Sequence, residues 1–200
     1  MAWAGFAAAE GFRHTSDVKK YLLRLYIFAV IMFLGNIILN TGFGTEKTFL
    51  DDNTFLTLAF GVSSLCLFKK AKKENSRIQK TAVLFTGAVF AAAGFTMQYG
   101  YIMIPVMLIS AWCGINFRKR DGMLILFSVF LFMIELQPGG SFREITAEVF
   151  AGGDFLFVLL IPFLHMYDGT RGSKSSLVKY FFYIYYPVHI WITAIMMNII

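Results

Sequence analysis

Apolar residues occur along this 200-residue chain in long runs separated by short polar stretches. No run alternates between apolar and polar residues in the way that a half-buried β-strand does. Helices satisfy their backbone hydrogen bonds internally, as a lipid environment requires. The pattern therefore predicts an all-α fold, a polytopic transmembrane helical bundle. The predicted apolar segments cover residues 1–12, 20–40, 53–68, 81–97, 99–115, 122–136, 148–165 and 180–200.

The lengths of these segments set the expected number of membrane crossings. A spanning helix needs about 20 apolar residues, with 17 as the usual lower end. Segment 1–12 is too short to span, and several others are near the limit, which implies tilting or local thinning of the bilayer. We therefore expect about seven full spans plus a partial N-terminal one, all within a single membrane domain covering residues 1–200.

Composition supports the membrane class. Hydrophobic residues make up 58% of the chain and charged residues 15%, against roughly a quarter charged in soluble domains. A DNA-binding module, a secreted disulfide scaffold and a disordered chain are excluded on this ground, and no nucleic-acid partner is expected. Cys66 and Cys113 both lie inside apolar runs and are interpreted as small core residues.

The charge of the polar stretches alternates along the chain. Cytoplasmic loops of membrane proteins carry an excess of Lys and Arg, so the positive stretches are predicted to be cytoplasmic and the C-terminus external. The positive stretches are 13–19, 69–80, 116–121 and 166–179, and the stretches without net positive charge are 41–52, 97–99 and 137–148. With this topology, the segment 1–12 would enter the membrane from outside. We therefore expect a further helix upstream of it.

Ionisable residues at membrane depth are costly and usually face the interior of the bundle. The candidates are Glu10, His14, Arg24, His165 and His189. His189 follows Lys179 by ten residues, about 15 Å along a helix, which places it near the midplane of the bilayer. Two alternatives stay open for these residues. Arg24 is either a functional residue or one that reaches back to the interface, and His189 is either a proton acceptor or a structural residue satisfied by its neighbours Tyr185 and Tyr186.

Two basic features could bind a phosphate-rich ligand. The 69–80 stretch either sets the topology or holds such a ligand, and the turn Asp168-Gly169-Thr170-Arg171-Gly172 presents an arginine that can bind a phosphate bidentately. The three histidines are not at metal-ligand spacing, so no metal site is expected.

Several of these stretches together resemble the TraX family, bacterial membrane proteins related to the F-pilin acetylation protein of conjugation systems. The similar stretches are Glu10–Thr15, Val18–Leu25, Asn53–Leu58 with Gly61, Tyr99-Gly100, Tyr167–Gly172 and Lys179–His189. They extend over essentially the whole chain. Family members carry an Asp-His pair in a first transmembrane helix that has no counterpart here, and Gln98 stands where the family often has Asp.

The resemblance implies an N-acetyltransferase of the bacterial cytoplasmic membrane. It would transfer acetyl from cytoplasmic acetyl-CoA to a pilin-like or other membrane-associated acceptor. We expect the catalytic residues to be His189, Tyr186 and Glu10. The residues expected to hold acetyl-CoA are Arg24, Arg171, Asp168, Lys69 and Lys70.

A second interpretation is a non-enzymatic membrane protein, either a transporter or a subunit of an assembly complex. Transporters typically pair broken helices in two repeated halves around a midplane site. The sequence shows no such pairing, and binding of labelled CoA would discriminate between the two interpretations.

Overall fold

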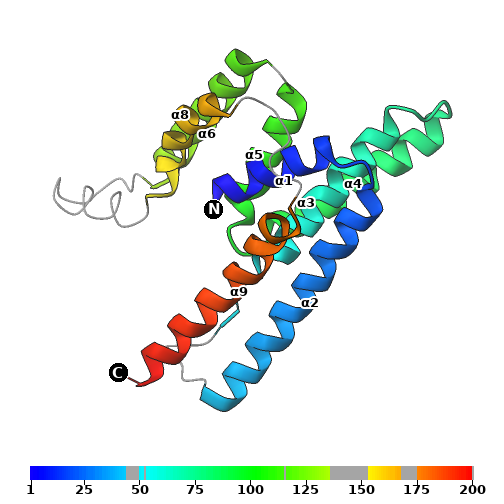
Figure 1. Ribbon diagram of the computed structural model, residues 1–200. Helices are drawn as coiled ribbons and strands as arrows, with labels where there is room; N and C mark the ends of the chain where they lie inside the picture. Colours follow the sequence, from blue (N-terminus) through cyan, green and yellow to red (C-terminus); the bar gives the residue numbers. More distant parts are fainter. Residues whose placement is uncertain (44–49, 52, 115, 136–152, 168–174, 200) are drawn as a thin grey trace.

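The computed structural model describes residues 1–43, 50–51, 53–114, 116–135, 153–167 and 175–199 (Figure 1). These residues form helices and their connections, without a strand among them, which confirms the all-α prediction. The elements are α1 (Ala2–His14), α2 (Val18–Phe43), α3 (Thr54–Ala71), α4 (Arg77–Phe95), α5 (Gly100–Cys113), α6 (Phe117–Glu135), the 3-10 helix η1 (Asp154–Leu159), α8 (Leu160–Met166) and α9 (Ser176–Ile199).

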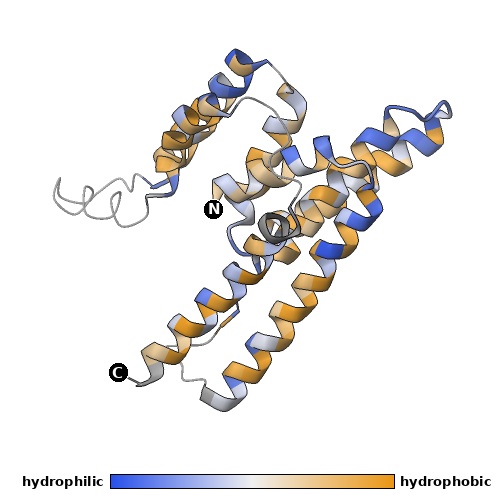
Figure 2. Ribbon diagram, in the orientation of Figure 1, coloured by the Kyte–Doolittle hydropathy of each residue, from blue (hydrophilic) through white to orange (hydrophobic). Residues whose placement is uncertain are grey.

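Within the described residues, four helices are long and apolar enough to cross a membrane. They are Val18–Gly42, Thr54–Ala71, Arg77–Phe95 and Tyr180–Met197. The stretches Gly100–Cys113 and Asp154–Met166 are apolar but shorter. The helix α6 has 19 residues, but four charged ones follow Phe117 at its start, which lowers its hydropathy. Hydrophobic residues predominate along these helices (Figure 2), and many of the large ones are exposed.

Some helices extend beyond the predicted apolar segments, although α4 ends two residues early and α5 is shorter than predicted. The charged stretch Arg118–Asp121, predicted as a loop, forms the first turns of α6, and Arg77 and Lys80 begin α4. Long basic side chains can reach water from a helix end that is still close to the membrane. A helix therefore includes such residues, and a boundary placed from hydropathy alone leaves them out.

The helices α2 and α9 run side by side in the same direction (Figure 1). Phe28 packs against Tyr183 with ring centroids 4.7 Å apart, and further along both helices the Trp191 indole N–H donates to the Asn36 amide oxygen at 2.9 Å. A Cβ at Gly35 would clash with the Trp191 ring, so glycine permits this close approach. The ends of α2 and α9 consequently lie on the same side of the molecule.

The helix α3 forms the centre of the bundle and packs against α1, α2, α4 and α5. Its spanning window is 61% buried, whereas that of α4 is 11% buried, so α4 lies on the outside. Met32, Met103 and Met107 are among the fully buried side chains around α3. A second, smaller apolar cluster joins α6 to η1 and α8.

Candidate functional site

Polar groups from α2, α3 and α9 meet at the N-terminus of α3. Asn53 caps this helix: its side-chain oxygen accepts from the Leu56 N–H at 3.2 Å, and its amide nitrogen donates to the Ala29 carbonyl at 2.9 Å. The hydroxyl of Thr54, the first residue of α3, is hydrogen-bonded to the hydroxyl of Tyr186 on α9. Ala29 lies in the middle part of α2, so the positive end of the α3 dipole lies inside the bundle.

Contacts on either side of Asn53 also hold the start of α3 in place. Leu50 lies beside the end of α2, where its N–H and carbonyl both bond to the Asn40 side chain at 2.9 and 2.8 Å. The next turn of α3 is bonded to the α4–α5 connection, where the Thr57 hydroxyl donates to the Gln98 carbonyl at 3.2 Å. Gln98 also has a buried side-chain oxygen without a hydrogen-bond partner in the described part of the chain.

His189 is bound to its own helix. Its Nδ1 is hydrogen-bonded to the Tyr185 carbonyl at 3.0 Å, and its ring stacks on that of Tyr185 and meets the edge of Tyr186. The two neighbouring tyrosines therefore do contact His189, although the hydrogen bond goes to a backbone carbonyl. His189 is partly exposed, and its Nδ1 is the ring nitrogen engaged by the helix backbone.

Arg24 links α2 to α9 near the same site. Its guanidinium carbon lies 5.9 Å from the centroid of the Tyr21 ring, and the group interacts with Tyr183 of α9. Tyr183 in turn stacks on Phe55 in the first turn of α3. Arg24 thus lies against aromatic groups of the bundle.

Glu10 is buried at the end of α1, with 8% of its surface exposed. Its carboxylate pairs with Arg13 at 2.8 Å and approaches His14 at 3.3 Å, one helical turn away on the same face. Arg13 also donates to the Ser110 carbonyl of α5 at 3.3 Å. This cluster therefore fixes the end of α1 against α5.

Lys69 and Lys70 take different positions at the end of α3. Lys69 lies over the Phe12 ring, 5.3 Å from its centroid, and lines a groove that also reaches Arg13 and Lys72. Lys70 is exposed and does not line this groove. The sequence thus grouped two lysines that the structure separates.

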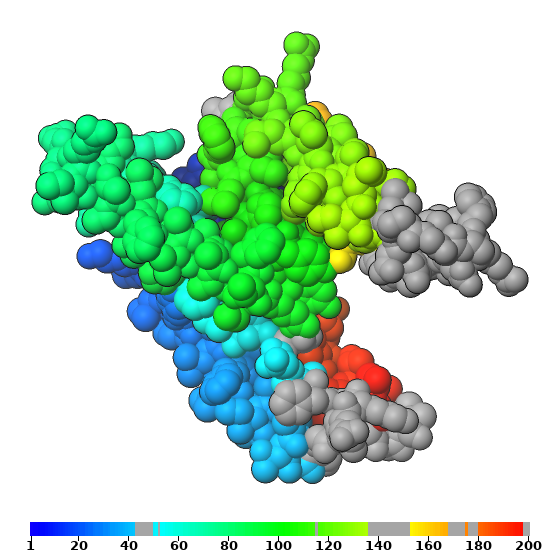
Figure 3. Space-filling model, turned by 180° about the vertical axis from the view of Figure 1, so that it is seen from behind, coloured from blue at the N-terminus to red at the C-terminus, as the bar shows by residue number. Residues whose placement is uncertain are grey.

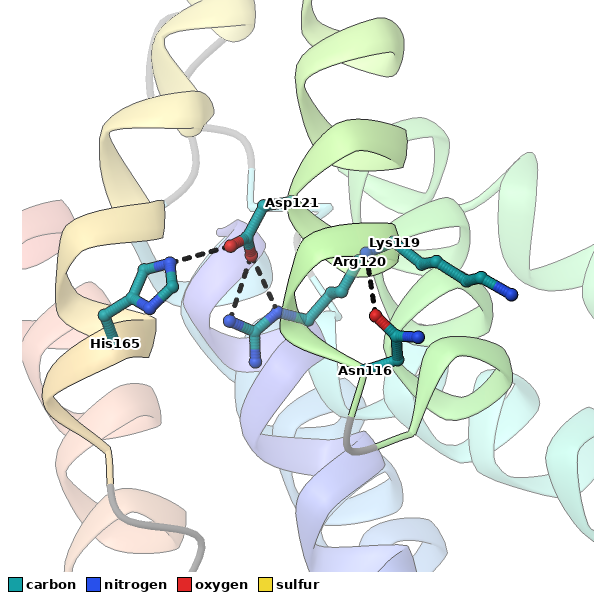
Figure 4. Close-up of polar contacts among 5 residues, drawn as sticks. All are labelled: Asn116, Lys119, Arg120, Asp121 and His165. Atoms are coloured by element: carbon teal, nitrogen blue, oxygen red, sulfur yellow. Dashed lines mark hydrogen bonds and ion pairs between the residues drawn. The ribbon is translucent and has the colours of Figure 1, made fainter.

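A charged cluster that the sequence analysis did not predict lies between α6 and α8 (Figure 4). Asp121 accepts from Nε and Nη2 of Arg120 at 3.1 and 3.0 Å, and its second oxygen lies 2.7 Å from Nε2 of His165. Arg120 is only 3% exposed and packs over the Phe6 and Phe117 rings. Asn116 caps the start of α6 by accepting from the Lys119 N–H at 3.2 Å.

Comparison with known proteins identifies the family. Residues 3–197 match the family described as TraX protein. The chain belongs to the TraX family. It is also 24% identical over 191 residues to the probable fimbrial assembly protein FimC, serogroup H1, of Dichelobacter nodosus, a match that covers 92% of this chain and 74% of that protein. No solved structure matches the chain.

The N-terminus of α3 is where several stretches that resemble TraX proteins meet. The stretches that resemble TraX proteins include the helix start at Asn53, the Tyr99-Gly100 step and the Tyr-Pro-Val-His stretch of α9. The structure brings these stretches together through Thr54, Thr57 and Tyr186. Because these stretches are far apart in the sequence, their contact could not be predicted from it.

Two predicted site residues, Asp168 and Arg171, lie outside the described residues. Within the described part of the chain, no three His, Cys, Asp or Glu side chains group together in a way that could hold a metal ion.

Proposed function

We propose that this TraX-family protein is an integral membrane N-acetyltransferase that transfers acetyl from acetyl-CoA to a pilin-like or other membrane-associated acceptor. The observation that carries the proposal is the meeting of the family's stretches around the N-terminus of α3. A role in pilus assembly is supported by the similarity to a protein described as functioning in fimbrial assembly.

The residues at this site match the needs of acyl transfer. An acceptor amine attacks the thioester carbonyl, the C–N bond forms, the C–S bond breaks, and CoA leaves as its thiol. His189 would accept the amine proton through Nε2 and return it to the sulfur, with its Nδ1 fixed by the Tyr185 carbonyl. Tyr186, oriented by Thr54, would donate to the developing oxyanion near the positive end of α3.

Basic side chains would hold the phosphates of the donor. Arg24 lies closest to the site, through its contact with Tyr183, and can bind a phosphate bidentately. Lys70 and Arg171, with Asp168 beside Arg171 in the sequence, are further candidates. Glu10 lies at the end of α1, where its carboxylate holds Arg13 and His14 in place.

The test is equilibrium binding of labelled acetyl-CoA to the purified protein in detergent, followed by transfer to an N-terminal pilin peptide. We expect saturable binding that unlabelled CoA displaces, and acetylated peptide as product. Arg24→Gln should weaken binding, whereas the matched exposed variant Arg118→Gln should not. Absence of CoA binding would contradict the proposal.

A non-enzymatic assembly subunit is the second candidate, favoured by the fimbrial description of the relative. It predicts that the protein binds the pilin peptide with equal affinity in the presence and absence of acetyl-CoA, and that no acetylated product forms.

A further inference from the structure

A large groove lies on the side of the bundle away from α9. Its volume is about 1020 Å³, whereas small-molecule sites enclose roughly 300 to 1,000 Å³. The helix α5 forms the floor through Ile104 and Leu108, α4 forms one side through Ala92 and Phe95, and α6 contributes Met123. In Figure 3 a hollow separates the projecting ends of α3 and α4 from the α5–α6 part of the surface.

The polar character of the groove is concentrated at one end. Lys69, Lys72 and Arg13 line it there, and most of the remaining lining is aliphatic or aromatic. Glu10 neutralises Arg13, but Lys69 and Lys72 make no ion pair with any residue that the structure describes. The groove therefore has an unbalanced positive end and a long apolar body.

The apolar body is open to the surroundings of the bundle. Phe95 is 49% exposed and Trp112 is 82% exposed, although both line the groove. The outer helix α4 turns most of its apolar surface outward. A ligand with an acyl chain could therefore enter sideways from the bilayer.

We propose that this groove binds an anionic phospholipid, with the phosphate at Lys69 and Lys72 and an acyl chain along α4 and α5. Lys69 and Phe95 lie toward opposite ends of the antiparallel α3–α4 pair, so the ligand lies along the depth of the membrane. The charge pattern predicts that the lysine end is cytoplasmic, where anionic headgroups attract basic residues. On this proposal Lys69 binds the lipid phosphate, and other basic residues bind the phosphates of acetyl-CoA.

The test is binding of lipid to the delipidated full chain in detergent, measured by native mass spectrometry and thermal stabilisation. Three ligands are compared: phosphatidylglycerol, phosphatidylcholine and soluble glycerol phosphate. We expect phosphatidylglycerol to bind and stabilise, phosphatidylcholine to bind at least tenfold more weakly, and glycerol phosphate to have no effect. Equal binding of the two lipids, or stabilisation by glycerol phosphate alone, would overturn the proposal.

Two pairs of variants locate the site. Each basic residue near an anionic lipid contributes about fivefold in affinity, so Lys69→Gln with Lys72→Gln should raise the Kd about 30-fold. The matched pair Lys73→Gln with Lys80→Gln removes the same charge from exposed positions outside the groove and should leave the Kd unchanged. An equal loss in both pairs would show unspecific attraction and contradict the assignment.

The apolar part is tested separately. Ala92→Trp should block the acyl chain, whereas Ala88→Trp, also exposed on α4 but outside the groove lining, should not. Unchanged binding in Ala92→Trp would overturn the placement of the chain. All these readouts measure lipid binding without acetyl transfer, so they are independent of the proposed enzymatic function.

Discussion

The hydrogen bond between His189 and the Tyr185 carbonyl allows a sharp test at the level of one residue. His189→Gln keeps an amide donor and acceptor at this position, but the amide does not titrate near neutral pH. We expect the variant to fold and bind CoA, and to lose transfer by about 10²–10⁴-fold, as for loss of a general base. The measurement is the rate of peptide acetylation at saturating acetyl-CoA.

His165→Gln provides the matched histidine control, because His165 pairs with Asp121 away from α9. It should keep the transfer rate of the wild type. If His189→Gln stays within about threefold of the wild-type rate, His189 is structural, and a loss confined to His165→Gln would move the base to α8.

The charged cluster of Figure 4 predicts an effect on stability. Asp121→Asn leaves the buried guanidinium of Arg120 without its carboxylate, and an uncompensated buried charge costs about 3 kcal/mol. We expect a clear fall in Tm, measured by thermal unfolding in detergent. Asp51→Asn removes an exposed carboxylate and should leave the Tm unchanged. Equal Tm values for the two variants would show that Arg120 does not depend on Asp121.

At the scale of the elements, the contact between α2 and α9 depends on one glycine. In Gly35→Ala the added methyl group meets the Trp191 ring and disturbs its hydrogen bond to Asn36, with a cost of about 1–3 kcal/mol. Gly42→Ala on the same helix has open space around it and should be neutral or stabilising. Unfolding of both variants in detergent measures the difference, and a Gly35→Ala protein as stable as Gly42→Ala would contradict the packing.

The start of α2 should respond to acid. Asp17 accepts from the Lys20 N–H at 3.0 Å, which lowers the pKa of its carboxyl below the ordinary value of 3.8. A lowered pKa in the folded state means that the stabilisation is complete above pH 3.8 and is lost as the pH falls through the folded-state value. We expect the protection factor of the Lys20 amide, the ratio of its intrinsic to its observed exchange rate, to fall over this acidic range.

Asp17→Asn is the control, because asparagine also caps helices but carries no titrating carboxyl group. The protection factor at Lys20 in this variant should not show the acid-dependent step. The same step in both proteins would assign it to another carboxylate.

The sequence predicted the existence of the helices better than their ends. Each described helix contains an apolar run that was predicted, because apolar length is what a helix in lipid requires. The ends depend on capping and on charged residues that continue the helix, such as Asp17 and Arg118. The expected span at 148–165 contains a 3-10 stretch followed by a short helix, a local geometry that hydropathy does not encode.

At the scale of the whole molecule, the sequence indicated the family but not the arrangement of its residues. Motifs identified Tyr186 and the start of α3 separately, and only tertiary packing places them in contact. The pair Asp121 and His165 is separated by 44 residues, and the groove is lined by five helices, so neither follows from local spacing. Contacts of this kind depend on how helices pack, which a single sequence does not reveal.

The last prediction concerns orientation in the membrane. Because α2 and α9 run in the same direction, the C-terminus must lie on the side where α2 ends, opposite to the α3–α4 connection. The positive charge of 69–80 predicts that this connection is cytoplasmic and the C-terminus external. A reporter fused after Ile200 should therefore show phosphatase activity without green fluorescence, and one inserted between Lys73 and Glu74 should show the reverse.

These two fusions separate the two parts of the prediction. If both reporters report the same side, the parallel packing of α2 and α9 is wrong, since it places them on opposite sides. If both results are inverted, the packing stands and the charge rule has failed for this protein. In that second case the lysine end of the groove would face outward, and acetyl-CoA bound near Arg24 could not come from the cytoplasm, so the orientation decides which side supplies the donor.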